Sequence, residues 1–600
     1  MKSKKLPKRS EVPEEFTWNL KDIFEDDAAW EKALEEAKAY PEKIGTYKGR
    51  LSESADVMLS YFRLSDEISV AIEKIYGYAS LKSDEDTGAA AYQIMKGKAV
   101  NLYVSIGGAS SFAVPELIGI PDETVAKFFS ERKELEVYRR PLEVIRRKKA
   151  HVLAPECEEI LARAREMAGG PEAIGGILRN ADMKYGEVAD SKGVMHPLSS
   201  GTFVLLEESS DRVLRENAFK RCYGKYGELK NTLAAILDSQ FKQLVFFADT
   251  RKYNSTLEAS LDNTEVPTDV YHNLIKAVHG NLDKMYKYVA LRKKLLSVEE
   301  LHMYDVYTPI VADVAKEIDF ETAKATVKDA LKVLGQDYID ILEEGFSSRW
   351  IDVYENEGKR SGAYSSGSSV PHPYVLLNHS NNLDSMFTLA HEMGHALHSY
   401  HSTKYQPTAT ADYVIFVAEV ASTVNEVLLM KYLLSKTTDK KEKAYLINHF
   451  LEQFKGTVYR QTMFAEFELE LGKMAENAET LTADALCAKY LELNKLYFGP
   501  DMVSDDEISL EWARIPHFFY NYYVFQYATG FSAAVAIAEK ILSEGEPAVK
   551  AYKKFLSSGS SKDPISLLRI AGVDMSTPDP VNRGLKLFGE LIDEITEICG

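Results

Sequence analysis

The chain has 600 residues, 45% of them hydrophobic, and a formal net charge of −19 at pH 7. This length allows several domains, and the composition allows a large buried core. The acidic balance argues against nucleic acid and anionic membranes as partners, because like charges repel. No apolar stretch reaches the length of about 18 residues that a membrane-spanning helix needs, so no membrane segment is expected.

Spaced apolar residues predict helices along most of the chain, so the expected fold is mainly α. In chain order these helices cover residues 27–44, 55–81, 87–103, 122–129, 139–151, 270–296, 320–334, 384–398, 413–430, 440–475 and 520–542. Two short runs of β-forming residues, 202–206 and 373–378, are predicted as strands. A glycine-rich stretch at 168–176 is expected to interrupt the helices, and 557–564 is expected to form a loop.

The pattern favours an N-terminal helical lobe over residues 1–200 and a catalytic domain over residues 201–600, with an approximate boundary. The cysteines are widely scattered: Cys157, Cys222, Cys487 and Cys599. They show no C-x-x-C spacing, which argues against a disulfide framework and favours a reducing compartment such as the cytoplasm. The basic start of the chain leads into acidic residues rather than an apolar run, which is not typical of a secretory signal.

The helix predicted from Asp384 contains an H-E-x-x-H sequence, His391 to His395. Residues four apart lie one above the other on a helix, so both imidazoles can reach one Zn²⁺. Glu392 projects beside them, where it can take a proton from a zinc-bound water. Gly394 is a poor helix former in this position, which suggests that another part of the chain approaches the backbone there.

The largely apolar helix 413–430 carries two glutamates on one face, Glu419 and Glu426. A lone buried carboxylate is unfavourable unless it is paired or bound to a metal. One interpretation pairs both glutamates with Lys or Arg from elsewhere. The other makes Glu419 the third zinc ligand and Glu426 the group that fixes the tautomer of a ligand histidine. His398 and His401 follow the motif closely and could be further metal-binding groups, but they are interpreted as bystanders or as residues that surround the ligands, because Glu419 already completes the set.

Several motifs together resemble the thimet oligopeptidase family of zinc metallopeptidases, and within it the oligoendopeptidase F branch. The first is His391-Glu-x-Gly-His395 followed by Glu419-Val-Ala-Ser-Thr-x-x-Glu426. The others lie at residues 6–10, 16–24, 359–365, 372–374 and 516–530. The resemblance therefore spans nearly the whole chain. It implies a multi-helix, two-lobed zincin-type metallopeptidase with a small β-sheet near the zinc helix and a deep substrate channel.

The resemblance also implies roles for individual residues. One Zn²⁺ per chain would be held by His391, His395 and Glu419, with Glu392 as general base. His517 and a tyrosine downstream of it would stabilise the oxyanion of the tetrahedral intermediate. The candidates are Tyr520, Tyr523 and Tyr527. On a helix, Tyr527 would share a face with each of the other two.

The resulting hypothesis is a zinc-dependent endopeptidase that hydrolyses internal bonds of short, unstructured oligopeptides. The strand at 373–378 is expected to pair with the substrate backbone, and the small-residue loop 361–369 is expected to lie over the active site. Two alternatives are a zinc peptidase that trims residues from one peptide end and a non-catalytic peptide-binding protein on the same scaffold. The second is disfavoured because Glu392 and all three ligands are present.

Overall fold

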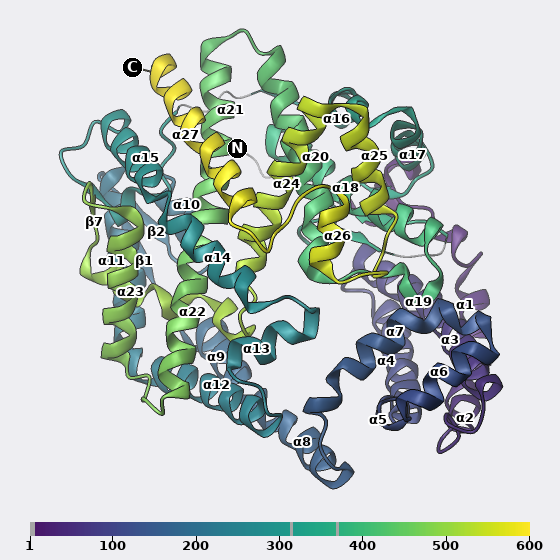
Figure 1. Ribbon diagram of the computed structural model, residues 1–600. Coiled ribbons are helices and arrows are strands. Elements are labelled where there is room, and N and C mark those ends of the chain that lie inside the picture. The colour runs from purple at the N-terminus through teal and green to yellow at the C-terminus, as the bar shows by residue number, and fades with distance from the viewer. Residues whose placement is uncertain (1–5, 312–315, 368–370, 600) are drawn as a thin grey trace. The chain divides into compact units, whose positions relative to one another are not determined.

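A computed structural model of the chain describes residues 6–311, 316–367 and 371–599 (Figure 1). Helices dominate and the strands are few and short, which confirms the predicted mainly α class. The chain divides into two compact units. The first consists of Met1–Ala150, Ala315–Tyr432 and Ile537–Val573, and the second of His151–Val314, Leu433–Ala536 and Asp574–Gly600. The predicted division at residue 200 concerns lobes that are continuous in sequence, and it stays a prediction.

The first unit contains the candidate metal-binding helices and one small sheet. Its helices are α1 (Asp27–Ala37), α2 (Tyr40–Gly45), α3 (Ala55–Glu85), α4 (Ala90–Ser110), α5 (Ala113–Gly119), α6 (Asp122–Glu131), α7 (Arg139–Arg146), α16 (Phe320–Leu331), α17 (Gln336–Ser347), α18 (Leu383–Tyr405), α19 (Thr408–Ala411), α20 (Ile415–Lys436), α25 (Glu546–Leu556) and α26 (Pro564–Ile570). The helix α24 (Phe525–Glu544) belongs partly to each unit, and the end of α20 after Tyr432 belongs to the second unit. The strands of the sheet are β4 (Ile351–Asp352), β5 (Tyr364–Ser366) and β6 (Tyr374–Leu376).

The second unit contains the histidine and tyrosines expected near the oxyanion. Its helices are α8 (Pro155–Ala168), α9 (Gly170–Ile177), α10 (Phe203–Glu207), α11 (Arg212–Glu228), α12 (Lys230–Thr250), α13 (Thr256–Leu261), α14 (Thr268–His279), α15 (Leu282–Leu295), α21 (Lys440–Gln453), α22 (Arg460–Glu476), α23 (Ala483–Phe498) and α27 (Asp579–Cys599). Its strands form two pairs, antiparallel β1 (Glu187–Ala189) with β2 (Met195–Pro197), and parallel β3 (Leu301–His302) with β7 (Met502–Val503).

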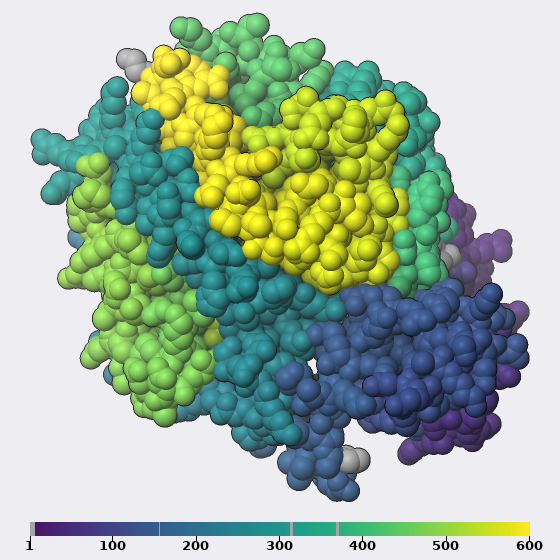
Figure 2. Space-filling model, in the orientation of Figure 1, coloured from purple at the N-terminus to yellow at the C-terminus, as the bar shows by residue number. Residues whose placement is uncertain are grey.

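The N-terminal helices of the first unit pack around their own hydrophobic core. Asp26 and Ser54 cap α1 and α3 by accepting backbone N–H groups of the first turn, a role that suits these residue types. Trp30 is fully buried, and its indole N–H donates to the carbonyl of Ile75 at 2.9 Å. On the face shown in Figure 2, the dark-blue helices α4 to α7 form one continuous surface.

The three-stranded sheet has the order β4-β6-β5, and β5 and β6 pack against α18. The expectation that residues 373–378 offer a free edge to substrate is wrong. This segment forms β6, the central strand, which pairs in parallel with β4 and antiparallel with β5. The two edge strands are β4 and β5, and β5 comes from the loop expected to lie over the site. Ser368 and Ser369 of that loop lie outside the described residues.

Two buried contacts fix this sheet. Lys359 and Asp352 form an ion pair with a separation of 2.7 Å, and both side chains are almost completely buried. The ammonium of Lys359 also donates to the carbonyl of Leu377 at 2.6 Å, so this buried charge has both an opposite charge and a hydrogen-bond acceptor beside it. The hydroxyl of Tyr364 donates to Asp84 of α3 at 2.7 Å. The edge strand β5 is therefore tied to the core helix α3 as well as to β6.

Three other sequence predictions need correction. Residues 203–207 form the helix α10 instead of a strand. The glycine-rich stretch does interrupt the helices, because α8 ends at Ala168, but the residues from Gly170 onward form a new helix, α9. The helix predicted from Tyr520 begins at Phe525, after a separate 3-10 turn over Pro516–Phe519. The signal at residues 202–206 was too short to decide, because a run of about five apolar residues fits a strand or a helix turn equally well.

The crossing of α18 and α20 is unusually close at Gly394. A Cβ atom added to Gly394 would lie 2.5 Å from the Cα of Ser422 and 2.7 Å from the carbonyl oxygen of Ala421. Only glycine allows the two backbones to approach this far. Asn425 of α20 adds a second connection, because its amide donates to the carbonyl of Ala390 at 3.1 Å. The expectation of a close backbone approach at Gly394 is confirmed.

Within the described residues, no single helix is long and apolar enough to cross a membrane. By length and composition, Ala90–Gly119 and Asp122–Glu131 meet the same criterion only as a pair, bent by 103°.

We expect Gly394→Ala to lower the free energy of unfolding by about 3 kcal/mol, because the added methyl must push the two helices apart. Urea denaturation of the purified variant measures this change. The matched control is Gly97→Ala, since Gly97 lies on an exposed part of α4 with nothing within 4 Å of an added Cβ. The control should gain about 0.5–1 kcal/mol from the better helix propensity of alanine. Equal stability of the two variants would contradict the close crossing.

Candidate active site

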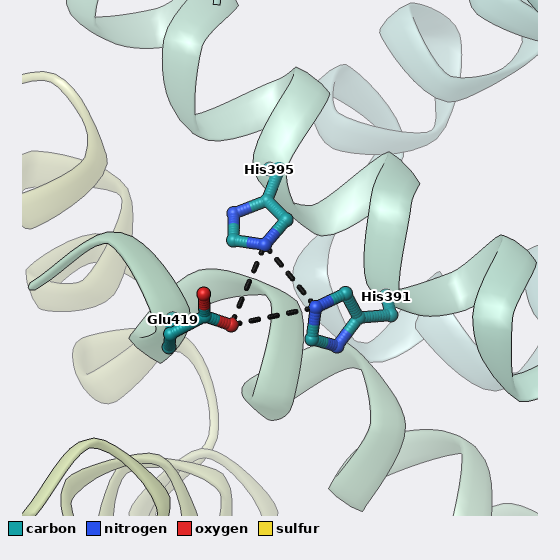
Figure 3. Close-up of side chains that lie close together, drawn as sticks. All are labelled: His391, His395 and Glu419. Atoms are coloured by element: carbon teal, nitrogen blue, oxygen red, sulfur yellow. Dashed lines mark hydrogen bonds and ion pairs between the residues drawn. The ribbon is translucent and has the colours of Figure 1, made fainter. Parts of the chain in front are cut away.

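The helix α18 brings the two motif histidines to one side, as their spacing predicted. It begins after Asn382, whose side chain accepts the backbone N–H of Ser385 at 2.8 Å. One turn apart on this helix, His391 and His395 turn their Nε2 atoms toward each other at 3.2 Å (Figure 3). Both rings are half-buried, so they remain accessible to an ion.

Glu419 of α20 completes the group. Its Oε2 atom lies 3.4 Å from Nε2 of His391 and 3.5 Å from Nε2 of His395, as the dashed lines in Figure 3 show. The ligand atoms of the three residues all lie within 4.8 Å of one another, and no other such group is found among the described residues. Two imidazole nitrogens and one carboxylate oxygen are the donor set of many catalytic zinc sites, which leave one position for water. The residues therefore fit a zinc ion.

The electrostatics of the group favour a cation. Burial alone would lower the pKa of His391, but hydrogen bonds with Glu419 and Glu426 outweigh burial and raise it to about 10. Burial would raise the pKa of Glu419, whereas hydrogen bonds with His391 and His395 and their charges hold it well below its usual range. Such a site binds a positive charge strongly, whether this is a proton or a metal ion.

Glu426 lies behind His391, two turns along α20 from Glu419. Its Oε1 atom is 2.5 Å from Nδ1 of His391, so the Nδ1–H donates to the carboxylate. This contact leaves the lone pair on Nε2, the nitrogen that faces His395 and Glu419. A carboxylate in this position orients a ligand histidine and increases its basicity. The structure thus brings Glu426 to the place that the second interpretation of this helix expected.

Glu392 lies next to the group, in the wall of a cavity. Its side chain is only 6% exposed, and its Oε2 atom has no hydrogen-bond partner among the described residues. Burial raises the pKa of Glu392; the neighbouring histidines act in the opposite direction, while Glu419 and Glu426 add to the increase. A carboxylate with a free oxygen and an increased proton affinity suits a general base.

The cavity beside these residues has a volume of about 1070 Å³, and the residues that line it all belong to the first unit. Its walls come from α2, α3, α4, β5 and its flanks, α18, α19 and α20. Ser365 of the edge strand β5 borders the same space as His391 and Glu419. No described residue of the lining is Lys or Arg. The described cavity wall of this unit therefore provides neither an ammonium nor a guanidinium group for a terminal carboxylate.

His398 and His401 are buried and lie apart from the candidate ligands. The ring of His398 stacks on Tyr413 with centroids 3.9 Å apart, and that of His401 lies near Tyr338 and Tyr405. Burial lowers the pKa of His398 to about 3 and that of His401 to about 4, so both are neutral at pH 7. They act as packing residues of α18.

In the second unit, His517 and the three candidate tyrosines form a cluster of rings. The ring centroid of His517 lies 5.5 Å from that of Tyr520 and 6.1 Å from that of Tyr527. Tyr523 lies 5.3 Å from Tyr527 and 6.4 Å from Tyr520. Burial and the charge of Arg460 lower the pKa of His517, so its imidazole is neutral at pH 7.

A turn, and not the expected helix face, brings these rings together. Asn521 and Tyr522 both have left-handed backbone conformations, with φ of 56° and 60°. Each such non-glycine residue costs about 1–3 kcal/mol and persists only where its surroundings hold it. Tyr522 itself is buried at 2% exposure, unlike Tyr520 at 46%. Sequence reasoning passed over Tyr522 because it stands among similar tyrosines.

The sequence-based prediction also missed Glu468, a carboxylate on α22 flanked by Phe467 and Leu469. The signal that identified Glu419, a single acidic residue in an apolar helix, was available for Glu468 too.

Comparisons with known proteins show the family to which the chain is similar. The pattern of peptidase family M3 matches residues 205–587, and that of oligopeptidase F matches residues 116–185. Oligopeptidase PepF of Bacillus subtilis is 45% identical over 100% of this chain and 89% of its own length. An oligoendopeptidase F homologue of Lactococcus lactis is 39% identical over 98% of each chain.

Solved structures of two peptidases are also similar to this chain. A putative peptidase from Chlamydophila abortus has a TM-score of 0.93 and 34% identity, and the match covers 99% of this chain and 100% of that one. Oligoendopeptidase-F from Enterococcus faecium has a TM-score of 0.75 and 36% identity, over 95% of this chain and 99% of that one.

Metal binding distinguishes the roles of the two glutamates of α20. We expect Glu419→Ala to lose most of its affinity for Zn²⁺, because one of three donors is removed. Glu426→Gln should retain the metal but bind it about 10–100-fold more weakly, since only the orientation of His391 is affected. Competition with a chromogenic chelator measures both constants without an activity assay. Unchanged affinity of Glu419→Ala would remove Glu419 from the ligand set.

Proposed function

Because the chain belongs to peptidase family M3, we propose that it is a zinc-dependent endopeptidase that hydrolyses internal bonds of short, unstructured oligopeptides. One observation carries this proposal: His391, His395 and Glu419 converge within 4.8 Å beside a buried glutamate, Glu392, in a cavity wall. The three ligands take one Zn²⁺ per chain. Neither an exposed serine nor a cysteine nucleophile is needed for this chemistry.

Zinc bound at such a site supplies a water with a pKa of about 7 and a Lewis acid for the peptide carbonyl. The protein contributes the proton transfers. Glu392 accepts the proton of the attacking water at Oε2, the atom without a hydrogen-bond partner among the described residues. It then passes this proton to the nitrogen of the leaving amine. Burial favours both steps, because it increases the proton affinity of Glu392.

His517 and the tyrosines Tyr520, Tyr523 and Tyr527 are proposed as donors to the oxyanion that forms on the substrate carbonyl. A neutral imidazole N–H and phenol O–H groups are suitable donors at pH 7. Donors placed for the tetrahedral state stabilise it more than the planar substrate, which increases kcat. Their clustering within 5.3–6.4 Å in the second unit supports a shared role.

The edge strand β5 is proposed as the part that holds the peptide backbone. It borders the cavity, and its outer edge has no strand partner among the described residues. Main-chain pairing along such an edge gives affinity without requiring a particular sequence. A terminal carboxylate would need a cation, and the described lining of the cavity contains neither Lys nor Arg. Both observations favour internal cleavage over trimming from the carboxyl end.

Glu392→Gln tests the proposed base. The amide keeps the size of the side chain but cannot accept the proton, so we expect kcat to fall by at least about 10³-fold. Zinc content, measured by elemental analysis, should remain at one ion per chain because Glu392 is not a ligand. Glu321→Gln, an exposed substitution on α16 in the same unit, serves as the control and should retain full activity. Loss of zinc from Glu392→Gln would show that Glu392 is structural.

Blocking peptide ends tests the substrate class. A fluorogenic peptide of about ten residues should be cleaved at nearly the same rate when it is N-acetylated and C-amidated, because the main-chain pairing does not involve the termini. Mass spectrometry identifies the bond that is cut. If blocking either end abolishes cleavage, the protein trims peptide ends instead. Native globular proteins, offered as a second substrate, should remain intact.

A further inference from the structure

The turn between the 3-10 segment Pro516–Phe519 and α24 has an unfavourable backbone conformation. Two consecutive non-glycine residues, Asn521 and Tyr522, adopt left-handed conformations there. A bulky side chain rarely adopts this conformation, so neighbouring groups must hold it. The turn joins Tyr520 to Tyr523, two of the proposed oxyanion donors. What holds the turn therefore sets where these phenols point.

The contacts of Tyr522 show how the turn is held. Its backbone N–H donates to Oε1 of Glu468 at 2.9 Å. Its phenol oxygen lies 2.7 Å from Oγ1 of Thr256, which in turn donates to Glu476 at 2.6 Å. Both glutamates lie on α22, and Thr256 begins α13. The ring is thus fixed at its backbone end and at its hydroxyl end by elements far away in the sequence.

Gly472 of α22 provides the space for this ring. A Cβ atom on Gly472 would lie 1.8 Å from the hydroxyl oxygen of Tyr522 and 3.1 Å from its Cζ atom. Any other residue would displace the phenol. Asn521 is held separately, because Gln240 of α12 donates to its side-chain oxygen at 2.8 Å and to the carbonyl of Phe519 at 3.3 Å.

Tyr522 carries the same phenol group as the proposed donors, but its position makes it unsuited to contact a substrate. Its side chain is buried at 2% exposure and its hydroxyl is engaged by Thr256, whereas Tyr520 is 46% exposed. Burial raises the pKa of the Tyr522 phenol, so it stays neutral. A buried tyrosine whose backbone N–H and hydroxyl both have partners is suited to hold the chain in place, and not to donate to a substrate.

We propose that Tyr522 is a positioning residue: seated against Gly472 and tied to Thr256 and Glu468, it holds the left-handed turn and thereby sets the placement of Tyr520 and Tyr523. The inference rests on the proposed function, in which these phenols donate to the oxyanion. Glu468 accepts the N–H of Tyr522 through Oε1. Burial raises its pKa to about 8, so at pH 7 it is a neutral carboxyl and adds no buried charge.

Gly472→Ala is the main test. The methyl group displaces the Tyr522 ring, so we expect kcat to fall by about 10–100-fold, close to the loss of one oxyanion donor. KM should change less than threefold, because the oxyanion exists only in the transition state. Zinc content and the melting temperature report on the rest of the protein. The matched control is Gly224→Ala on α11, where nothing lies within 4 Å of an added Cβ.

A rescue variant separates positioning from general damage. Adding Tyr522→Phe to Gly472→Ala removes the oxygen that collides at 1.8 Å, while the ring carbon at 3.1 Å needs only a small shift. The double variant retains the contact with Glu468 but lacks the contact with Thr256, so it should recover part of the kcat that Gly472→Ala loses. An unchanged kcat in Gly472→Ala, or no recovery in the double variant, would overturn the anchoring role.

Glu468 provides a second, independent pair of variants should Gly472→Ala fail to fold. Glu468→Gln keeps an oxygen that accepts the N–H of Tyr522, and we expect it to retain at least a third of kcat. Glu468→Leu has a similar volume but no acceptor and should lose about tenfold or more, since the buried N–H is left without a partner. Equal kcat values for the two variants would contradict the inference.

Failure of the inference can be distinguished from failure of the proposed function. Tyr→Phe variants at positions 520, 523 and 527 test the donors directly and leave the turn contacts of Tyr522 unchanged. If all three retain kcat, the role of the tyrosines fails, and with it the kinetic consequence of the turn. A crystal structure of Gly472→Ala with residues 521 and 522 still left-handed would instead overturn the anchoring itself while leaving the donors in place.

Discussion

The close contact between α18 and α20 at Gly394 and Ser422 is the constraint on which the candidate metal site depends. The ligand atoms sit on side chains of limited reach, so the two helices must approach closely for Glu419 to come within 3.5 Å of both histidines. Gly394 permits this approach because it has no Cβ. Asn425 then fixes the rotation of α20 through the carbonyl of Ala390. One glycine and one amide thus determine whether three ligands converge.

Burial acts on three glutamates of this protein, and their neighbours decide the outcome. Glu419 faces two imidazoles, which lower its pKa despite burial and prepare it to bind a cation. Glu392 has an oxygen without a partner among the described residues, and burial raises its pKa, as a base requires. Glu468 meets one backbone N–H, and burial keeps it protonated. The same desolvation therefore acts on the proposed ligand Glu419, the proposed base Glu392 and the neutral acceptor Glu468, with different outcomes.

The convergence of His391, His395 and Glu419 could be predicted from sequence because the candidate site is local. His391 to Glu426 is one continuous segment, and two helical spacings define its geometry. The helical class followed from periodicity for the same reason. The strand order could not be predicted, because the pairing of β6 with both β4 and β5 depends on contacts outside the strand itself. The turn at Tyr522 was also hidden, since its partners Gln240, Thr256 and Glu468 are 54 or more positions away in the chain.

A regular helix would not bring the hydroxyls of Tyr520 and Tyr527 to a common point. On an α-helix, residues seven apart are separated by about 10 Å along the axis, so Tyr520 and Tyr527 would not meet one oxygen atom. In the observed turn, His517 lies within 5.5 Å of Tyr520 and 6.1 Å of Tyr527, measured between ring centroids. A strained connection thus gathers donors that a regular element would keep apart. The strain requires a rigid anchor, and a buried tyrosine seated on a glycine supplies one without exposing a further polar group to the substrate.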